Sequence, residues 1–490
     1  MSEELFKSAV IHHSKKNFSK AKEIYETLLK KNPNNSNILQ NYATLLSQIK
    51  EFKKADEIFK KCLSISLNDS LLLYNYGKFN HDQKNFNKAI EFYQKSFTIN
   101  KKNDMPLYNI GNIYLSQNKF EQAIDFFKKT IHVNPNNFMA YNNIGIAYKR
   151  TGNFSDAINS YKSAINLNNN YIDAHLNYGT ILLTLNKLKE GFEEYEWRKK
   201  SKAFTDYIEY QSLNLESKVW NGENLENKKL FVISEQGIGD LIQFSRYLYL
   251  LKKKYKVEII LKIKSKKFIN FFKKNDFKII FEGEKIPNHD YHIFIVSLAK
   301  IFLQTNEIFC EPVNHFQSEP QIEKKWKKIF KDIQGKKIGI HWSTSSLIPE
   351  RDLPLKYFED LTTKVNASFF VLQKDVNEID KKTILKNKNI FYFPNFDNSM
   401  AAFSDSIEII KNLDLVITAD TAVAHLSATL GKKTWVILPF VSDWRWFTKT
   451  KNSDWYPTVT LYRQNKIGEW TSIFKTIEGD LNSYIKLLNN

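Results

Sequence analysis

The sequence is poor in the features that mark disulfide-bonded and membrane-spanning proteins. Only two of the 490 residues are cysteines, Cys62 and Cys310, and they lie far apart. This excludes a disulfide framework and a cysteine-based metal site, and we expect a reducing compartment. No window approaches 18 uninterrupted apolar residues, and the first residues (MSEELFKSAV) lack the apolar core of a signal peptide. We therefore expect a cytoplasmic protein without a transmembrane segment.

Several motifs of well-known enzyme classes are also absent. The sequence contains no Walker motif and no GxSxG motif. No cluster of His, Asp and Glu residues has the spacing of a metal site. We expect neither a bound metal nor a resident cofactor.

Positive charge, by contrast, is in excess. The chain has 72 Lys and Arg residues against 53 Asp and Glu, which gives a formal net charge of +19. This balance admits nucleic acid, anionic membrane surfaces or anionic small molecules as partners. The lysines, however, are scattered as pairs and triplets and form no single basic arm. A solvated lysine surface is expected, and no nucleic-acid partner.

Length and composition indicate several folded domains. A chain of 490 residues is too long for one compact core, and two to four domains are expected. Hydrophobic residues make up 42% of the chain, with 37 Phe and 24 Tyr, so wholesale disorder is excluded.

A strict 34-residue period runs through the first part of the chain. Alanine recurs at this period, with phenylalanine three positions before it and an aromatic residue four positions after it. The three series are Ala21, Ala55, Ala89, Ala123 and Ala157; Phe18, Phe52, Phe86, Phe120 and Phe154; and Tyr25, Phe59, Tyr93, Phe127 and Tyr161. Glycine keeps the same period at Gly77, Gly111, Gly145 and Gly179. The small residues let two antiparallel helices approach, and the aromatics are expected to fill the gap to the next repeat.

This pattern resembles the tetratricopeptide repeat. It predicts an α-solenoid over residues 1–205, with five full repeats to about residue 171 and a sixth, atypical one after them. In the sixth repeat Gly191 replaces the alanine and Leu188 the phenylalanine. Degeneration of this kind suits a terminal repeat that docks onto another part of the protein.

A column of asparagines follows the same period and is not explained by packing. Its members stand two positions before the small residue of each first helix: Asn41, Asn75, Asn109, Asn143 and Asn177. Asparagine carries both a donor and an acceptor, so a ladder of them in the concave groove could pair with the backbone of an extended peptide. The alternative is that these side chains bond within the solenoid. We favour a protein or peptide partner in the groove.

After a polar connector at residues 206–227, strands alternate with helices. This alternation predicts parallel sheets flanked by helices. Two such series imply two half-domains, at residues 228–330 and 331–490, with a cleft between them. In sheets of this kind ligands bind at the carboxyl ends of the strands.

The first strand-to-helix junction reads SEQGIGDLIQFSRYLYLL. Gly237 and Gly239 permit a tight turn with an exposed backbone, and Asp240 opens the helix. The third glycine of a dinucleotide fingerprint is missing. Asp240 is either a helix cap or a cleft carboxylate that acts as general base.

The second half-domain carries two further candidate segments. In HWSTSSLIPERDLP, Ser343 follows a strand and Arg351 precedes a helix. Arg351 is either a bidentate phosphate clamp or an exposed surface arginine. In DLVITADTAVAHLSATLGKKTWVILP, Asp420, Thr421 and Ala422 form a turn into a helix that also carries His425. Unpaired N–H groups and small side chains at such a helix start suit a diphosphate, although a plain helix cap has the same appearance.

Together these segments resemble glycosyltransferases of the bacterial heptosyltransferase-like group (family 9) that carry tetratricopeptide repeats. Their architecture is similar to that of O-linked N-acetylglucosamine transferases. The resemblance covers most of residues 220–460, including HDYHIFIVSLAKIF and DWRW…WYP. It implies a GT-B fold of two Rossmann-like half-domains and inverting, metal-independent transfer from a nucleotide-diphosphate sugar.

The resemblance also implies roles for individual residues. Asp240 matches the acid near the reacting centre, and Gly237 and Gly239 belong to its turn. Ser343 and Arg351 lie where the donor phosphates are bound, although lysine is commoner at the second position. Asp420, Thr421, Ala422 and His425 match the donor-diphosphate turn, with alanine where glycine is usual.

Three hypotheses follow from these observations. The first is a glycosyltransferase whose repeats recruit a protein or peptide acceptor or a localising partner. The second is a catalytically inactive scaffold in which the repeats bind partners and the transferase fold is vestigial. The third is an enzyme that acts on a glycan or lipid-linked acceptor, with repeats used for assembly alone.

Overall fold

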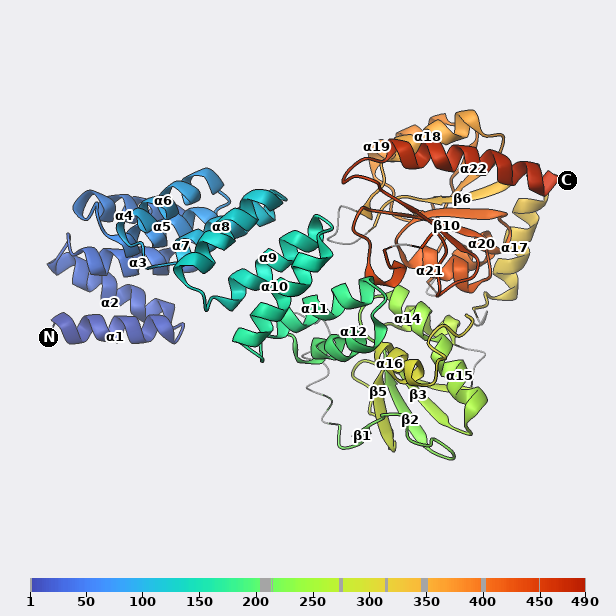
Figure 1. Ribbon diagram of the computed structural model, residues 1–490, viewed down its shortest axis with the longest axis horizontal. Coiled ribbons are helices and arrows are strands. Elements are labelled where there is room, and N and C mark those ends of the chain that lie inside the picture. The colour runs from blue at the N-terminus through green and yellow to red at the C-terminus, as the bar shows by residue number, and fades with distance from the viewer. Residues whose placement is uncertain are drawn as a thin grey trace. The chain divides into compact units, whose positions relative to one another are not determined.

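The computed structural model describes residues 2–202, 213, 215–272, 276–312, 316–344, 351–397, 402–448 and 450–489. The chain divides into two compact units, Met1–Asn177 and Tyr178–Asn490 (Figure 1). The division falls within helix α11 (Ile172–Thr184). The second unit therefore includes helix α12 (Leu188–Tyr195) as well as both sheets. Residues 203–212 and 214, part of the region that the sequence assigns to the end of the array and the connector, lie outside the described residues.

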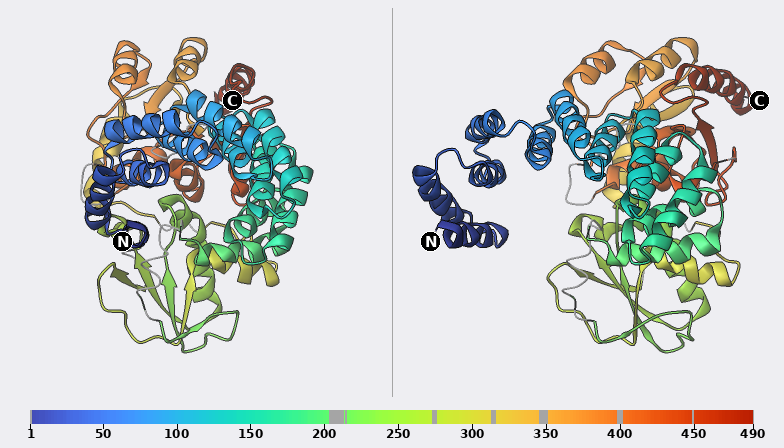
Figure 2. Two further views of the ribbon diagram at one scale, coloured as in Figure 1. Left: turned by 90° about the vertical axis from the view of Figure 1, so that its left-hand side faces the viewer. Right: turned by 60° about the vertical axis from the view of Figure 1, so that its left-hand side comes forward.

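The first unit consists of antiparallel helix pairs, one pair for each 34-residue period. Five pairs lie wholly within it: α1 (Ser2–Ser14) with α2 (Phe18–Lys31), α3 (Ser36–Gln48) with α4 (Phe52–Ile65), α5 (Ser70–Asp82) with α6 (Phe86–Ile99), α7 (Met105–Ser116) with α8 (Phe120–Val133), and α9 (Phe138–Arg150) with α10 (Phe154–Leu167). Each second helix begins at the periodic phenylalanine. Successive pairs stack side by side in a curved row (Figures 1 and 2). The predicted helical solenoid is confirmed.

The periodic glycines and aromatics meet within each repeat. A Cβ atom on Gly111 would lie 2.5 Å from a ring carbon of Phe127, and one on Gly145 would lie 2.5 Å from Tyr161. The aromatic ring of the second helix therefore covers the glycine of the first helix of the same pair. The rings also reach the next repeat, where they were expected: the ring centroids of Phe59 and Tyr76 lie 5.2 Å apart.

The first sheet of the second unit has five strands, all parallel. They are β1 (Lys218–Val219), β2 (Lys229–Ile233), β3 (Glu258–Ile263), β4 (Phe277–Phe281) and β5 (Tyr291–Phe294). Their order, β1-β5-β2-β3-β4, places a reversal of the chain path between β2 and β5. The single helix expected after Asp240 is in fact two helices, α14 (Ile238–Phe244) and α15 (Arg246–Lys254), which meet at Ser245.

The second sheet has six parallel strands. They are β6 (Lys337–His341), β7 (Ser368–Val371), β8 (Ile390–Phe391), β9 (Leu415–Ala419), β10 (Thr434–Leu438) and β11 (Val459–Arg463). Counted along the chain, the order β8-β7-β6-β9-β10-β11 is 3-2-1-4-5-6, the doubly wound arrangement with its switch point between β6 and β9.

Burial explains why these strands read as continuous apolar runs. Every residue of β9 and β10 is buried, because helices cover both faces of a parallel sheet. One core cluster joins strands of the second sheet to α18 (Leu355–Lys364) and α22 (Thr471–Asn489).

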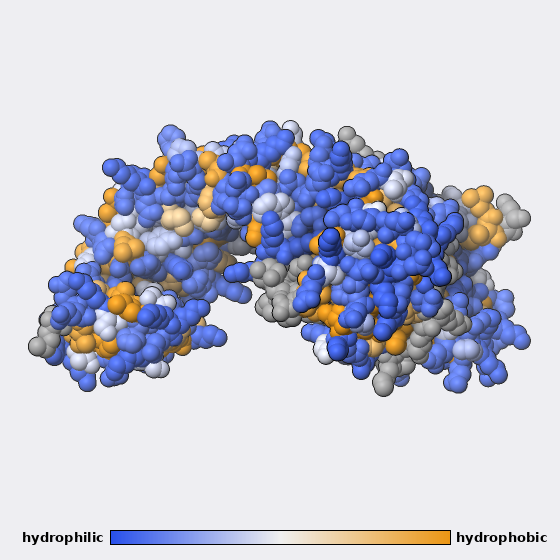
Figure 3. All heavy atoms as spheres, turned by 90° about the horizontal axis from the view of Figure 1, so that it is seen from below, coloured by the Kyte–Doolittle hydropathy of each residue, from blue (hydrophilic) through white to orange (hydrophobic). Residues whose placement is uncertain are grey.

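The molecular surface is mainly hydrophilic on the face shown in Figure 3, with hydrophobic side chains scattered among polar ones. In the part of the chain that the structure describes, no helix has the length and apolar character needed to cross a membrane.

Candidate functional site

One pocket of about 500 Å³ collects the turns at the carboxyl ends of strands from both sheets. The turn after β2 faces it from the first sheet, and the ends of β6, β7 and β9 face it from the second. These are the switch points at which doubly wound sheets bind ligands. All nine residues singled out in the C-terminal sequence line this pocket: Gly237, Gly239, Asp240, Ser343, Arg351, Asp420, Thr421, Ala422 and His425.

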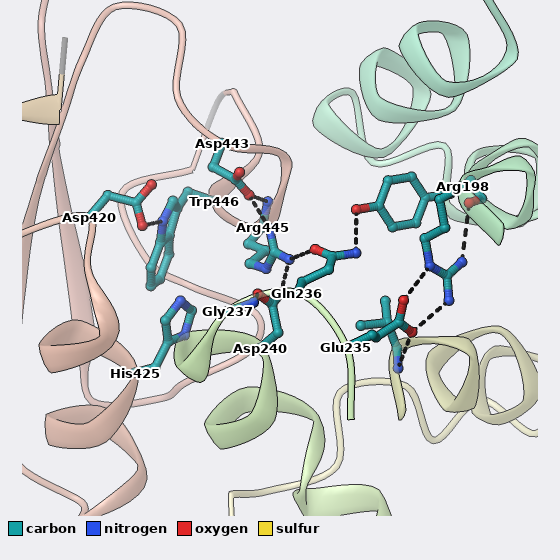
Figure 4. A network of polar contacts seen from close by, with 12 residues as sticks. Arg198, Glu235, Gln236, Gly237, Asp240, Asp420, His425, Asp443, Arg445 and Trp446 are labelled. Atoms are coloured by element: carbon teal, nitrogen blue, oxygen red, sulfur yellow. Dashed lines mark hydrogen bonds and ion pairs between the residues drawn. The ribbon is translucent and has the colours of Figure 1, made fainter. Parts of the chain in front are cut away.

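Asp240 lies on the first turn of α14 and is tied to its surroundings through both carboxylate oxygens. The Gly237 N–H donates to Asp240 Oδ2 at 3.0 Å, so the side chain caps its own helix. Asp240 Oδ1 accepts from the guanidinium of Arg445 (Figure 4). The helix-cap and cleft-carboxylate interpretations are thus compatible, because one side chain occupies both positions.

Helix α21 (Ala422–Thr429) begins at the wall of the pocket. Thr421 caps it, accepting the Val423 N–H at 3.3 Å through its side chain and the Ala424 N–H at 3.0 Å through its carbonyl. The starts of α14 and α21 pack closely: a Cβ atom on Gly239 would lie 3.1 Å from the His425 ring. The glycine at 239 thus permits the two helix starts to meet.

His425 is buried beneath the pocket. Its ring stacks on Trp446 with 5.2 Å between centroids, and Nδ1 lies 3.0 Å from the Tyr456 hydroxyl. Burial, with a smaller contribution from Arg445, lowers the pKa of His425 to about 3. The imidazole is therefore neutral at physiological pH.

Five charged side chains of alternating sign form a row of ion pairs along the pocket. Arg445 contacts Asp240 and Asp443, with 2.7 Å between Nη1 and Asp443 Oδ1. Arg351 contacts Asp443 at 3.0 Å and Asp420 at 3.4 Å. Asp420 also accepts the Trp446 indole N–H at 2.8 Å. Arg351 is a half-buried member of this row of ion pairs and not an exposed surface residue.

The two aspartates of the second sheet differ in their titration. Burial raises the pKa of Asp420, and the nearby Arg351 only partly opposes this. Burial also acts to raise the pKa of Asp443, but Arg445 and Arg351 outweigh it and hold that pKa well below its usual range. Asp443 is the firmly ionised partner of both arginines.

The ends of β6 and β7 complete the wall. The Ser343 N–H donates to Gln373 Oε1 at 3.1 Å, so the two strand ends are joined by a side chain. His341 Nδ1 lies 3.5 Å from the Thr421 hydroxyl, and burial lowers the pKa of His341 to about 4. Among the described residues, no group of three or more His, Cys, Asp or Glu side chains is arranged to hold a metal ion.

Residues whose partners are remote in the chain were not among those predicted from the sequence. Asp443 and Arg445 belong to the DWRW motif, which was noted but given no role. Gln236 lies one residue before the predicted glycine turn, and its amide oxygen accepts from Arg445 at 3.3 Å. An aspartate and an arginine in the loop that follows a buried strand are the signal that would have pointed to the DWRW motif.

The asparagine ladder occupies equivalent, half-buried positions on the first helices of the repeats. Three of its members bond to the preceding repeat: Asn109 Nδ2 to the Tyr74 hydroxyl at 3.0 Å, Asn143 Nδ2 to the Tyr108 hydroxyl at 3.1 Å, and Asn177 Nδ2 to Asn142 Oδ1 at 3.0 Å. Part of the ladder's bonding capacity is therefore used within the solenoid. The role of the ladder in binding a peptide stays a prediction.

Comparison with known families supports the helical repeats. Tetratricopeptide repeat models match residues 71–103, 106–137, 126–159 and 148–186, and a Suppressor of forked protein (Suf) model matches residues 3–76. The N-terminal part of the chain thus consists of tetratricopeptide repeats, a class of module that suggests a protein-interaction role.

Among curated proteins, the chain is similar to Protein FlbA of Caulobacter vibrioides. The two are 24% identical over an alignment of 316 residues, and the match covers 59% of this chain and 52% of FlbA. The match therefore spans about half the length of that relative.

Similar solved structures include MamA and PilW. MamA is 25% identical, with 34% of this chain and 91% of MamA covered and a TM-score of 0.31. PilW, a type IV pilus biogenesis factor, is 19% identical, with 43% of this chain and 98% of PilW covered and a TM-score of 0.38.

Proposed function

We propose that the second unit is a GT-B glycosyltransferase built from two Rossmann-like halves, which moves a sugar from a nucleotide-diphosphate sugar to an acceptor hydroxyl with inversion. One observation carries this proposal. Residues that resemble a donor site, drawn from turns nearly 200 positions apart in sequence, all line a single pocket at the switch points of both sheets. Its volume of about 500 Å³ is in the range of pockets that enclose small molecules.

The diphosphate would lie against the start of α21. The Ala422 N–H and the positive end of the helix dipole face the pocket there. Arg351 and Arg445 would each exchange one carboxylate partner for a phosphate oxygen, and such charge-assisted pairs are strong. As the bond from the anomeric carbon to the phosphate oxygen breaks, these groups would stabilise the negative charge that develops on the leaving nucleoside diphosphate.

Asp240 would act as general base on the opposite wall. In the transfer step, a bond forms between the acceptor oxygen and the anomeric carbon, and the hydroxyl proton passes to the Asp240 carboxylate. A carboxylate has about four acceptor sites, so the bonds to Gly237 and Arg445 leave room for an acceptor hydroxyl. A positioned base contributes about 10²- to 10⁴-fold in rate.

The repeats would recruit the acceptor or a localising partner. Such a partner would be a protein or peptide that lies in the groove and pairs with the asparagine ladder. A glycan or lipid-linked acceptor is the alternative, in which case the repeats serve assembly and the pocket chemistry is unchanged.

Donor binding and turnover test the proposal directly. Full-length protein would be titrated with UDP, GDP and ADP in a calorimeter and then incubated with the corresponding sugar nucleotides, with release of the diphosphate measured. We expect one nucleotide to bind and its sugar to be released or transferred. Asp240→Asn should lower turnover by about 10²-fold or more while nucleotide binding is retained. The matched control Asp276→Asn, at an exposed ion pair with Lys252, should behave as wild type.

A second candidate function is a binding scaffold without catalysis. The observation that favours it is that both arginines already have carboxylate partners in the pocket: Arg351 pairs with Asp420 and Asp443, and Arg445 pairs with Asp240 and Asp443. A scaffold would bind peptides through the asparagine ladder and would turn over none of the sugar nucleotides. Failure of all three nucleotides to bind, together with a peptide affinity that falls on Asn109→Ala and Asn143→Ala, would replace the first proposal with this one.

A further inference from the structure

Helix α12 and the 3-10 helix that follows it, η1 (Glu196–Lys200), contact the turn that precedes Asp240, the candidate base. Two of their side chains, Arg198 and Tyr195, form hydrogen bonds with two successive residues of that turn, Glu235 and Gln236. Arg198 makes two hydrogen bonds to Glu235, Nε to Oε2 and Nη2 to Oε1, both at 2.8 Å. The Tyr195 hydroxyl accepts from Gln236 Nε2 at 2.8 Å. The next residue, Gly237, is the one bonded to Asp240.

Gln236 has an unusual backbone conformation. Its φ is 61°, in the left-handed region that costs a residue with a side chain roughly 1 kcal/mol or more. The surrounding contacts must therefore hold it there. Lys264 Nζ donates to the Gln236 carbonyl oxygen at 2.8 Å. The Gln236 side-chain amide is bonded to Tyr195 on one side and to Arg445, labelled in Figure 4, on the other.

The chemistry of the neighbours fixes the orientation of this amide. Arginine carries donors only, so the Gln236 amide oxygen must face Arg445, and the amide N–H then faces the Tyr195 hydroxyl. Tyr195 reaches Arg445 by a second route as well. Its ring lies 5.7 Å edge-to-face from Trp444, and the Arg445 guanidinium lies 4.4 Å above the same indole.

We propose that Tyr195 and Gln236 are positioning residues of the glycosyl-transfer site: the pair holds Arg445 against Asp240 and fixes the turn from which Asp240 projects. This rests on the proposed function above. The last repeat helix keeps the periodic aromatic residue at Tyr195 and thereby contributes to the positioning of the site. Neither residue is among those that line the pocket.

The test uses the full-length chain with Tyr195→Phe, which removes one hydroxyl, and Gln236→Met, which is close in size and forms neither bond. Tyr462→Phe is the matched control, because that buried tyrosine donates its hydroxyl to Asp480 at 2.8 Å away from the pocket. We expect kcat to fall at least tenfold in both variants, with the donor KM changed less than threefold. Neither substitution should lower kcat further in an Asp240→Asn background.

A second measurement separates this proposal from the proposed function. Hydrogen exchange at the Gly237 amide, which is bonded to Asp240, should accelerate at least tenfold in both variants and not in the control. If wild type turns over a donor but both variants keep its kcat and its Gly237 exchange rate, the positioning proposal is wrong. If no donor is turned over but exchange accelerates, the pair still fixes the turn, and it is the transferase assignment that fails.

Discussion

Arg351 is the residue on which the donor-binding proposal depends most. It separates Asp420 from Asp443, and without it two carboxylates would face one another with little solvent. Like charges at short range in a buried site repel strongly. Arg351 therefore has two roles to test, one in stability and one in affinity.

We expect Arg351→Met to lower the free energy of unfolding by about 2 kcal/mol and to weaken nucleotide binding at least tenfold. In the double variant Arg351→Met/Asp420→Asn the repulsion is relieved, so stability should return while affinity stays low. Chemical denaturation and calorimetry measure the two quantities. If the double variant regains affinity as well, Arg351 is a structural residue and not a phosphate ligand.

His425 links the pocket to the pH dependence of stability. Its folded-state pKa of about 3 lies below the ordinary value of 6.5. Between these two values the unfolded chain binds a proton that the folded chain does not, so stability is full above pH 6.5 and is lost as pH falls toward 3.

For this one side chain the loss between pH 6.5 and 4.5 is about 2 kcal/mol. His425→Gln should remove that slope from the unfolding free energy measured across this pH range. His132→Gln, at an exposed position on α8, should leave the slope as in wild type. Equal slopes in all three proteins would mean that His425 takes up a proton in the folded state.

Residues close in sequence were predictable and remote partners were not. Gly237, Gly239 and Asp240 were recognised from one turn, and Thr421 from one helix start, because helix starts after buried strands follow local rules. Arg445 was not recognised, because its partner Asp240 is 205 residues away in the chain. No local sequence pattern predicts the positive φ at Gln236 or the hydrogen bonds of its amide to Tyr195 and Arg445.

At the scale of the element, the 34-residue period was enough to predict the helix pairs. Its small residues mark the places where two helices touch, and its phenylalanines mark the helix starts. Strands of the second unit were predictable for a similar reason, since β9 and β10 are wholly buried and read as apolar runs. The break between α14 and α15 at Ser245 has no comparable pattern in the sequence and was not predicted.

The contact between Gly111 and Phe127 should be one of the least tolerant in the array. An alanine Cβ at position 111 would lie 2.5, 2.7 and 2.9 Å from three ring carbons of a fully buried Phe127. Gly111→Ala should therefore destabilise the first unit by about 1–3 kcal/mol. Thermal or chemical unfolding followed by circular dichroism measures this change.

Gly479→Ala is the matched control for that substitution. Gly479 also lies within a helix, α22, but a Cβ atom there would meet no heavy atom within 4 Å. The change should stabilise the second unit by about 0.5–1 kcal/mol, because alanine loses less backbone entropy in a helix. A destabilising effect of equal size at both positions would contradict the packing argument.

At the scale of the whole molecule, the last repeat helix and the first sheet belong to one compact unit. A buried ion pair of Arg198 with Glu235 links η1, which follows that helix, to the turn after β2, and the two side chains are 3% and 0% exposed. Arg198 also donates to Ser297 at 2.7 Å, and Glu235 accepts the Val296 N–H at 3.1 Å. The pair therefore joins the end of the repeats to two neighbouring strand ends, β2 and β5.

Replacing one member of this pair by an apolar residue leaves the other buried without an ion-pair partner. Arg198→Met should lower the stability of the second unit by about 3–5 kcal/mol, because Glu235 is left buried without its cation. Arg198→Met/Glu235→Leu removes both charges and should recover most of that loss. Lys364→Met, at an exposed pair with Glu478, should cost less than about 1 kcal/mol.

Denaturant unfolding should show the loss in the transition of the second unit and leave the transition of Met1–Asn177 unchanged. If Arg198→Met is as mild as Lys364→Met, the helix that carries Tyr195 is held by its apolar contacts, and the polar link to the pocket is not what fixes it there.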